Sequence, residues 1–496
     1  MPDLLVDLET EKADAPLYHR IADSIRTDIL AGRLRRGERV PSTRTLATEL
    51  HVNRNTVAQA YEQLISEGFL DGRHGSGTYV ARELPHAQFS GLAPKPALKA
   101  LRRVAFANSP TPPEHYRRMM NPDGPQPAPG IDLELRLGAP DLSAFPLRQW
   151  RRTVSNQLLV ARRDRMFNGC SYGLPELRKA IAGYLVRARG IDCTYRNVLI
   201  TSGSQQGLWL ASSLLVAPGE RVMMEDPGYL GARAVFQSLH AQVQPVAVDS
   251  EGIDSGAVAQ LAAQEPAPKL LYLTPSHQYP TGGTLSAARR MELLELSARH
   301  GFMIVEDDYD SEFRYEGRPV RALAGIDTAG VVCYLGTFSK VMYPSLRVGY
   351  VVAPEWLVDA MVGLRWHMDF QPPTLESAAL AEFIEEGHFE RHLRRMRALY
   401  AEKREAFVNE MERQLPGTVV RPLPAGGMKL ALQVPRGLTR QDAIRRAQAV
   451  GVKVYDPSHS YSDPSRCPQQ VLAGFTSLSA AQMQEAARRL AQGWKG

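Results

Sequence analysis

The stretch VVCYLGTFSKVMYPSLRVGYVV, residues 331–352, organises the second half of the chain. Its two β-branched, apolar runs, residues 331–335 and 348–352, are typical of buried strands, and a turn rich in Gly, Thr, Ser and Pro separates them. Lys340 lies in that turn. Its amine can form a Schiff base with a carbonyl cofactor, although a solvated lysine in a surface turn is the simpler alternative. The nearby groups suited to holding a phosphate are Thr337, Ser339 and Arg347.

Length and composition indicate a multidomain protein of ordinary globular type. A chain of 496 residues, 44% hydrophobic and 23% charged, is long enough for more than one core. The four cysteines are far apart and form no close pair, so neither a disulfide framework nor a metal site is expected, and we expect a cytoplasmic location. No apolar run approaches the about 18 residues of a membrane span, so no membrane association is expected.

The N-terminal segment predicts a winged helix-turn-helix over residues 13–82. Apolar residues from Leu17 to Ile29 recur at helical spacing, and Gly32 ends that helix. Ser42 is a suitable N-cap for a short helix that reaches Leu50, and Asn53 can cap a second helix. Residues 69–80 then predict two small strands joined by a Gly-rich tip, which is the wing.

Basic residues gather in this segment where a DNA backbone would lie. Residues 33–54 contain six arginines and two glutamates, a local charge of +4. The first turn of the second helix would face base edges, while the N-terminus of the first short helix suits phosphates. A helical subdomain with a solvated basic face is the alternative. The candidate DNA-binding residues are Ser42, Arg44, Arg54, Asn55, Thr56, Arg73 and His74.

Residues 83–130 form a proline-rich linker. They contain ten prolines in 48 positions, six lysines and arginines, and three acids. Such a composition favours an extended, semi-rigid connector with little regular structure. A linker of this length lets the N-terminal domain lie far from its own C-terminal domain.

Residues 131–496 predict an α/β domain with a mostly parallel sheet, because strand-like and helix-like segments alternate. Ligands in such sheets bind beyond the carboxyl ends of the strands. That rule selects the residues that follow the predicted strands: Ser204, Gln205, Tyr229, His277, Asp307, Tyr309 and Lys340.

These residues suit pyridoxal 5'-phosphate (PLP). Ser204 and Gln205 begin a helix after a strand, where N–H groups bind phosphate. Asp307 ends an apolar strand and needs a cationic partner, which a protonated pyridine nitrogen supplies. Tyr309 can hydrogen-bond the phenolic oxygen, and Tyr229 can stack on the ring. Each residue alone has an ordinary structural alternative; the combination favours the cofactor.

Two resemblances extend this interpretation. PSTRTLATELHVNRNTVAQAYEQL, residues 41–64, together with GSGTYV, residues 75–80, resembles the winged helix of the GntR family. EDDYDSEFRY, TPSHQYPTG and GTFSKVMYPSLRVGY resemble the aminotransferase-like domain of the MocR subfamily of GntR regulators. The resemblance implies a fold-type I domain with a small subdomain from about residue 375. It also implies a homodimer, often head-to-tail, with Tyr172 as a candidate contribution from the partner subunit.

The effector site departs from an amino-acid aminotransferase. Such an enzyme usually holds the substrate carboxylate with an arginine of the small domain, and residues 454–461 contain none. The remaining candidates are His459, Lys429 and Arg466; a loop histidine and a solvent-facing strand lysine are the alternatives for the first two.

The sequence therefore predicts a PLP-dependent DNA-binding regulator that senses PLP or an amine through Lys340 and binds operator DNA. An aminotransferase that carries a DNA-binding module is the main alternative, with weak transamination possible in either case. A dead dimerisation scaffold is disfavoured because Lys340, Asp307 and Arg347 are all present.

Overall fold

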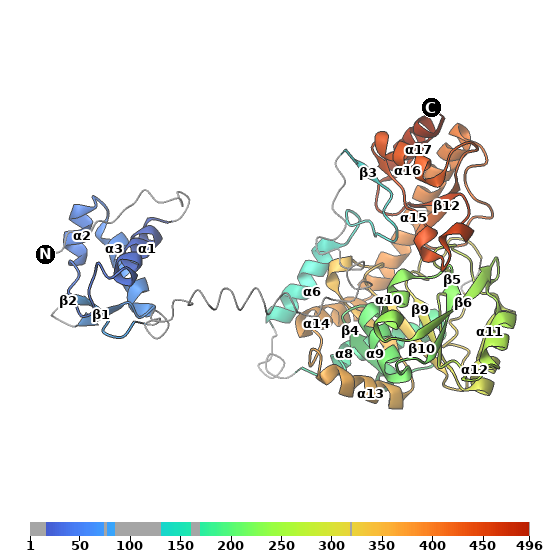
Figure 1. The fold of residues 1–496 in the computed structure, drawn as a ribbon, viewed down its shortest axis with the longest axis horizontal. Helices are drawn as coiled ribbons and strands as arrows, with labels where there is room; N and C mark the ends of the chain where they lie inside the picture. The colour runs from blue at the N-terminus through green and yellow to red at the C-terminus, as the bar shows by residue number, and fades with distance from the viewer. Residues whose placement is uncertain (1–15, 74–76, 85–129, 160–168, 318–319, 496) are drawn as a thin grey trace, which may run out of the picture. The chain divides into compact units, whose positions relative to one another are not determined.

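The computed structural model describes residues 16–73, 77–84, 130–159, 169–317 and 320–495. The chain divides into two compact units, which are described separately (Figure 1). The predicted linker lies almost entirely outside the described residues. No helix in these described ranges is long and apolar enough to cross a membrane.

The N-terminal unit has the predicted winged helix-turn-helix arrangement. Its elements are α1 (Leu17–Leu30), α2 (Thr43–Glu49), α3 (Arg54–Ser66), β1 (Leu70–Arg73) and β2 (Gly77–Val80). The two strands pair antiparallel and form the wing. Ile21, Ile25 and Ile29 of α1 are buried with the inner face of α3, so the predicted helical spacing does face the core.

Caps and one tyrosine hold the two short helices in place. The Ser42 hydroxyl accepts a hydrogen bond from the Thr45 N–H at 3.1 Å, and the Asn53 side chain accepts one from the Asn55 N–H at 2.9 Å. Tyr61 of α3 donates to the carbonyl of Pro41 at 2.9 Å. The beginning of α2 is therefore tied to the middle of α3.

The C-terminal unit is built on an eight-stranded sheet in the order β4-β11-β10-β9-β8-β5-β6-β7 (Figure 1). All neighbouring pairs are parallel except those that involve β11 or β7, so the prediction of a mostly parallel sheet is confirmed. The strands are β4 (Val198–Thr201), β5 (Arg221–Asp226), β6 (Gln242–Asp249), β7 (Gly252–Ile253), β8 (Leu270–Leu273), β9 (Met303–Asp308), β10 (Val332–Thr337) and β11 (Gly349–Val352).

Helices cover both faces of this sheet. Successive side chains of β5 point to opposite faces of the sheet: Met224 packs in one apolar cluster and Met223 in another. The first cluster contains residues of α9, α10 and α13, and the second contains residues of α11 and α12. Their bounds are α9 (Ser204–Leu215), α10 (Leu230–Ser238), α11 (Ser255–Ala262), α12 (Ala287–His300) and α13 (Glu355–Trp366).

A further group of helices packs around the remaining core. α14 (Thr374–Glu385) contacts α6 (Leu147–Leu159) and α8 (Pro175–Arg189). The elements beyond α14 form a C-terminal lobe that contains two small two-stranded sheets, β12–β14 and β13–β3. Those elements are α15 (His388–Gln414), β12 (Lys429–Gln433), α16 (Arg440–Ala449), β13 (Val452–Lys453), β14 (Gln470–Gly474) and α17 (Ala480–Lys495).

The chain crosses into this C-terminal lobe from both ends of the unit. β3 (Leu133–Glu134), near the start of the unit, pairs parallel with β13. The lobe is therefore completed by residues more than 300 positions upstream, which a boundary near residue 375 does not anticipate. This crossing also brings residues 137 and 138 to the large sheet, where they line a cavity.

Candidate functional site

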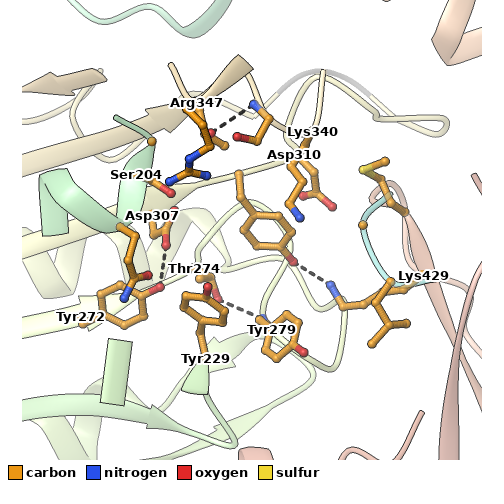
Figure 2. Close-up of a pocket in the computed structure, with 18 residues that line it drawn as sticks. Ser204, Tyr229, Tyr272, Thr274, Tyr279, Asp307, Asp310, Lys340, Arg347 and Lys429 are labelled. Carbon is orange, nitrogen blue, oxygen red and sulfur yellow. Dashed lines mark hydrogen bonds between the residues drawn. The ribbon is translucent and has the colours of Figure 1, made fainter. Parts of the chain in front are cut away.

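A cavity of about 330 Å³ opens at the carboxyl ends of the parallel strands (Figure 2). It receives side chains from the strand ends, from the N-terminus of α9 and from β12 of the C-terminal lobe. The predicted site residues that line it are Ser204, Gln205, Tyr229, Asp307, Tyr309, Thr337, Ser339, Lys340, Arg347 and Lys429.

Lys340 follows β10 and is partly buried. Burial lowers the pKa of its amine, and the nearby carboxylates of Asp310 and Asp307 oppose that shift. Gly138 leaves space for the amine: a Cβ at this position, where φ is +61°, would lie 3.1 Å from Lys340 Nζ. The absence of a side chain at residue 138 therefore allows the Lys340 amine to pack close to the backbone of that segment.

Asp307 has one oxygen satisfied and one free. Tyr272 donates its hydroxyl to Oδ2 at 2.6 Å, whereas the buried Oδ1 has no hydrogen-bond partner in the part of the chain that the structure describes (Figure 2). Burial raises the pKa of this carboxyl to about 6. A buried carboxylate with a free oxygen is unfavourable until a cationic donor pairs with it. A protonated ring nitrogen is such a donor.

The other end of the cavity suits a phosphate. The N-terminus of α9 lies there, and its N-cap residue Gly203 has no side chain to cap the helix. The Ser339 hydroxyl is buried without a partner among the described residues. Arg347 donates to the carbonyl of Ser202 at 2.6 Å, so its guanidinium lies against the beginning of α9. Gly349 permits this packing, since a Cβ there would lie 2.8 Å from the Ser204 nitrogen. N–H groups of the helix N-terminus, a hydroxyl and a guanidinium thus lie at the same end of the cavity, where they can bind a phosphate.

Lys429 faces the cavity from the C-terminal lobe and is only 5% exposed, so the solvent-facing alternative is wrong. Its amine donates to the Tyr309 hydroxyl at 2.7 Å and lies 5.0 Å from the ring centroids of both Tyr309 and Tyr279 (Figure 2). The Tyr309 hydroxyl in turn donates to the carbonyl of His277 at 2.7 Å. Burial lowers the pKa of Lys429 to about 8.

Four predicted residues lie outside the cavity lining. His277 is buried and shares a 2.7 Å hydrogen bond with Asp310, and the Tyr172 hydroxyl donates to Asp359 at 2.7 Å. His459 is exposed in a short helical turn, and Arg466 lies 3.6 Å from Asp226. His277 was selected by its position after a strand, which predicts an edge of the sheet but not the direction of a side chain. Tyr172 was selected from the family resemblance, and His459 and Arg466 as possible partners of an effector carboxylate.

The cavity also contains residues that sequence reasoning missed. Thr274 and Asp310 follow β8 and β9, so the position after a strand is a signal that could have identified them. Tyr272 lies within a strand, and Gly138 comes from the crossing segment far upstream. No local pattern marks these last two, because their position depends on the tertiary fold.

Most of the predicted DNA-binding residues that the structure describes are exposed on the N-terminal unit. Ser42, Arg44, Arg54 and Asn55 are exposed and Thr56 is half-buried. Arg44 and Arg54 line the same shallow hollow between α2 and α3, and Arg54 Nε lies 3.4 Å from the Thr43 hydroxyl. The Arg73 guanidinium lies 4.8 Å from the centroid of the Tyr79 ring on the wing. His74 lies outside the described residues.

Comparison with known proteins assigns the family. Residues 17–80 match the family of bacterial regulatory proteins of the gntR type, and residues 133–490 match aminotransferase class I and II. The probable rhizopine catabolism regulatory protein MocR of Rhizobium meliloti is 35% identical over 95% of this chain and 92% of its own length. This chain belongs to the MocR subfamily of GntR-type transcriptional regulators.

Other MocR-type relatives extend the comparison. The pyridoxine biosynthesis regulator PdxR of Corynebacterium glutamicum is 30% identical over 82% of this chain and 81% of its own. The regulator TauR of Rhodobacter capsulatus is 34% identical over 96% of each chain. As a GntR-type regulator, the chain binds DNA through its helix-turn-helix unit.

Solved structures support the cofactor of the MocR-type C-terminal unit. Kynurenine aminotransferase of Pyrococcus horikoshii, solved with PMP, aligns with a TM-score of 0.69 at 27% identity, over 80% of this chain and 98% of its own. The α-aminoadipate aminotransferase LysN of Thermus thermophilus, complexed with N-(5'-phosphopyridoxyl)-L-leucine, aligns with a TM-score of 0.68 at 28% identity, over 80% and 98%. PLP is the cofactor of this unit, and the free oxygen of Asp307 together with the buried Ser339 hydroxyl fits it.

Proposed function

We propose that this MocR-type regulator holds PLP through a Schiff base to Lys340 and senses either PLP itself or an amine effector in the same cavity. The free Asp307 Oδ1 carries the proposal, because a buried carboxylate oxygen aimed at a cavity with a lysine amine matches a pyridine nitrogen and an aldehyde on one ligand. When bound, PLP supplies an aldehyde that condenses with amines and a ring that accepts electrons.

Each residue then has a separate task in binding. Asp307 holds the proton at the ring nitrogen, and Tyr272 orients that carboxylate through its 2.6 Å hydrogen bond. Ser204, Ser339 and Arg347 bind the phosphate, with Gln205 and Thr337 beside them. Tyr229 lines the cavity and would pack on the cofactor ring; its own ring lies edge-on to that of Tyr279, with the centroids 5.6 Å apart.

Signal transfer needs the C-terminal lobe and a partner subunit. Lys429 enters the cavity from β12, so an effector that contacts Lys429 would change the position of the C-terminal lobe. In a head-to-tail homodimer, lobe movement alters the spacing of two winged helices and therefore the fit to two operator half-sites. The dimer, its head-to-tail arrangement, the contribution of Tyr172 and a cytoplasmic location are parts of this proposal.

A visible absorption spectrum tests the cofactor proposal. Purified full-length protein incubated with PLP is expected to show the visible band of a Schiff base, and Lys340→Ala is expected to lose it. Lys429→Met is the matched control, because it replaces the other lysine of the cavity and keeps Lys340. A colourless wild-type protein after incubation with PLP contradicts the proposal.

An active aminotransferase is the second candidate. The cavity contains the lysine, the acid and the phosphate-binding groups together, and the similar solved proteins are aminotransferases. Its lining contains Arg347 at the phosphate end and Lys429, with no further arginine in the described residues to grip a carboxylate. We therefore propose slow half-transamination at most. Steady-state turnover with a panel of amino donors and 2-oxo acids separates the candidates.

A further inference from the structure

Asp310 is a buried carboxylate to which the proposed binding of PLP assigns no role. It lines the cavity two residues beyond β9 and is 1% exposed. Its Oδ1 shares a 2.7 Å hydrogen bond with His277 Nδ1, and its Oδ2 has no hydrogen-bond partner in the described residues. Such an oxygen, removed from water and unpaired, strongly favours a cationic ligand.

The position of Asp310 is fixed from behind by His277. The imidazole is 2% exposed, and Gly426 makes room for it: a Cβ at residue 426 would lie 2.4 Å from His277 Nε2. Gly427 likewise lies close to Asp310, with an ideal Cβ 3.3 Å from Oδ2. The carboxylate therefore has little freedom to turn away from the cavity.

Two lysines share the electric field of this carboxylate. Burial lowers the pKa of Lys340 and of Lys429, and for each of them Asp310 is the foremost charge that opposes the shift. Asp307 and Asp310 both line the cavity with Lys340 (Figure 2). Asp307 is committed to the ring nitrogen, so Asp310 is the remaining carboxylate for an ammonium group.

Cofactor binding changes this balance. Attachment of PLP would replace the Lys340 ammonium, which has three N–H donors, by an imine nitrogen, which has at most one. A primary ammonium entering from solvent would bring both positive charge and N–H donors to the unpaired Asp310 oxygen. Asp310 thus provides a place for the cation of an incoming amine in the cavity that Lys340 also lines.

We propose that the Asp310 carboxylate, held by His277, binds the ammonium group of a primary amine effector through the Oδ2 oxygen that has no partner among the described residues. The assignment to an effector rests on the proposed function, whereas the ammonium site itself does not. No covalent step is needed for this binding.

The first experiment tests the ammonium site without PLP. In Lys340→Ala the truncated side chain leaves space for a small amine beside Asp310. Ethylammonium or propylammonium chloride is expected to raise the melting temperature of this variant by several degrees in a saturable manner. The double variant Lys340→Ala/Asp310→Asn is expected to show no such rise.

Controls make this first result decisive. Potassium chloride at equal ionic strength accounts for general salt effects, and tetramethylammonium chloride accounts for a cation that donates no hydrogen bond. An equal amine-dependent rise in the single and double variants overturns the ammonium site. The same melts report whether each variant folds.

The second experiment tests the effector assignment in the PLP-loaded full chain. Amine titrations followed by the visible spectrum are recorded for wild type, Asp310→Asn and His277→Gln, after the PLP constant of each is measured. In Asp310→Asn the dissociation constant for the amine is expected to rise at least 10-fold more than the dissociation constant for PLP. His277→Gln keeps a donor toward Asp310, so a smaller rise is expected.

The outcomes of the two experiments are distinguishable. A colourless wild type contradicts the proposed function and leaves the first experiment to decide the ammonium site. Equal changes in the amine and PLP constants of Asp310→Asn overturn the effector assignment, because they indicate a general disturbance of the cavity.

Discussion

The two units of this chain carry their functional charges in opposite settings. In the C-terminal unit Asp307, Asp310 and Lys429 are almost fully buried, and two of the three have an oxygen without a partner in the described residues. In the N-terminal unit Arg44 and Arg54 are exposed to solvent. A buried charge without a partner is costly, so it selects a small ligand that can pair with it. Exposed charges instead attract a polyanion over a distance.

The difference explains why the units need different amounts of structure. The cavity depends on contacts among segments that are far apart, such as Gly138 beside Lys340 and Lys429 beside Tyr309. The winged helix needs only two capped helices held together by its own small core. A change in ionic conditions or a single substitution should therefore affect the two units differently.

Salt should separate them most clearly. Between about 50 and 200 mM salt, operator affinity is expected to fall by roughly 1,000-fold, because each neutralised phosphate releases condensed counterions. PLP affinity is expected to change by less than about 3-fold, since buried groups are poorly screened. Parallel titrations of one preparation, with fluorescent operator DNA and with PLP, provide the measurement. Similar salt slopes for both ligands contradict the comparison.

Asp307→Asn should give the next largest effect. The amide cannot provide the negative charge that matches a protonated ring nitrogen, so PLP affinity is expected to fall by about 100-fold, or about 2.7 kcal/mol. Tyr272→Phe removes only the hydrogen bond to Asp307 Oδ2 and serves as the graded control, with a loss of about 5-fold expected. Absorbance titration measures both. A loss under about 3-fold in Asp307→Asn argues against its role at the ring nitrogen.

The same contrast explains what sequence reasoning predicted. Ser204, Asp307 and Lys340 each follow an apolar run, so the strand-end rule brought them to one edge of the sheet. The winged helix followed from apolar spacing, the capping residues Ser42 and Asn53, and local charge. These features depend on neighbours within a few residues.

What sequence reasoning did not predict depends on tertiary contacts. His277 was assigned to the cofactor, yet its ring supports Asp310 from behind. The strand pairing of β3 with β13 brings Gly138 to Lys340 across about 200 residues, and nothing near Gly138 in the sequence marks it. Lys429 was a candidate among three, and only its burial against two tyrosine rings distinguishes it from His459 and Arg466.

Within the exposed surface, Arg54 should matter most for DNA. It lies in the first turn of α3, where a recognition helix meets base edges. Arg54→Ala is expected to reduce operator affinity by about 10-fold, and the loss should be smaller on unrelated DNA if Arg54 reads a base. Ser66→Ala, at the opposite end of the same helix, is the control and should change affinity by less than about 2-fold. Equal losses on operator and unrelated DNA assign Arg54 to the phosphate backbone instead.

Lys429 provides the most subtle test of buried charge. Its pKa is lowered from 10.5 in the unfolded chain to about 8 in the folded one, so the folded state binds fewer protons between these two values and stability rises with pH across that window. Below pH 8 the full cost of burying the ammonium is present. Lys429→Met is therefore expected to stabilise the cofactor-free protein at pH 7 by about 1–3 kcal/mol, less the lost hydrogen bond to Tyr309.

That gain should shrink toward zero as pH rises from about 8 to 10.5, because the wild-type amine then becomes neutral only in the folded state. Urea unfolding of both proteins at pH 7 and pH 9.5 measures the difference. Lys179→Met replaces an exposed lysine and should show a difference that hardly depends on pH. If Lys429→Met destabilises the protein equally at both values, then the pairing of Lys429 with Tyr309 and its neighbouring rings outweighs desolvation, and buried charge in this cavity is stabilised before any ligand arrives.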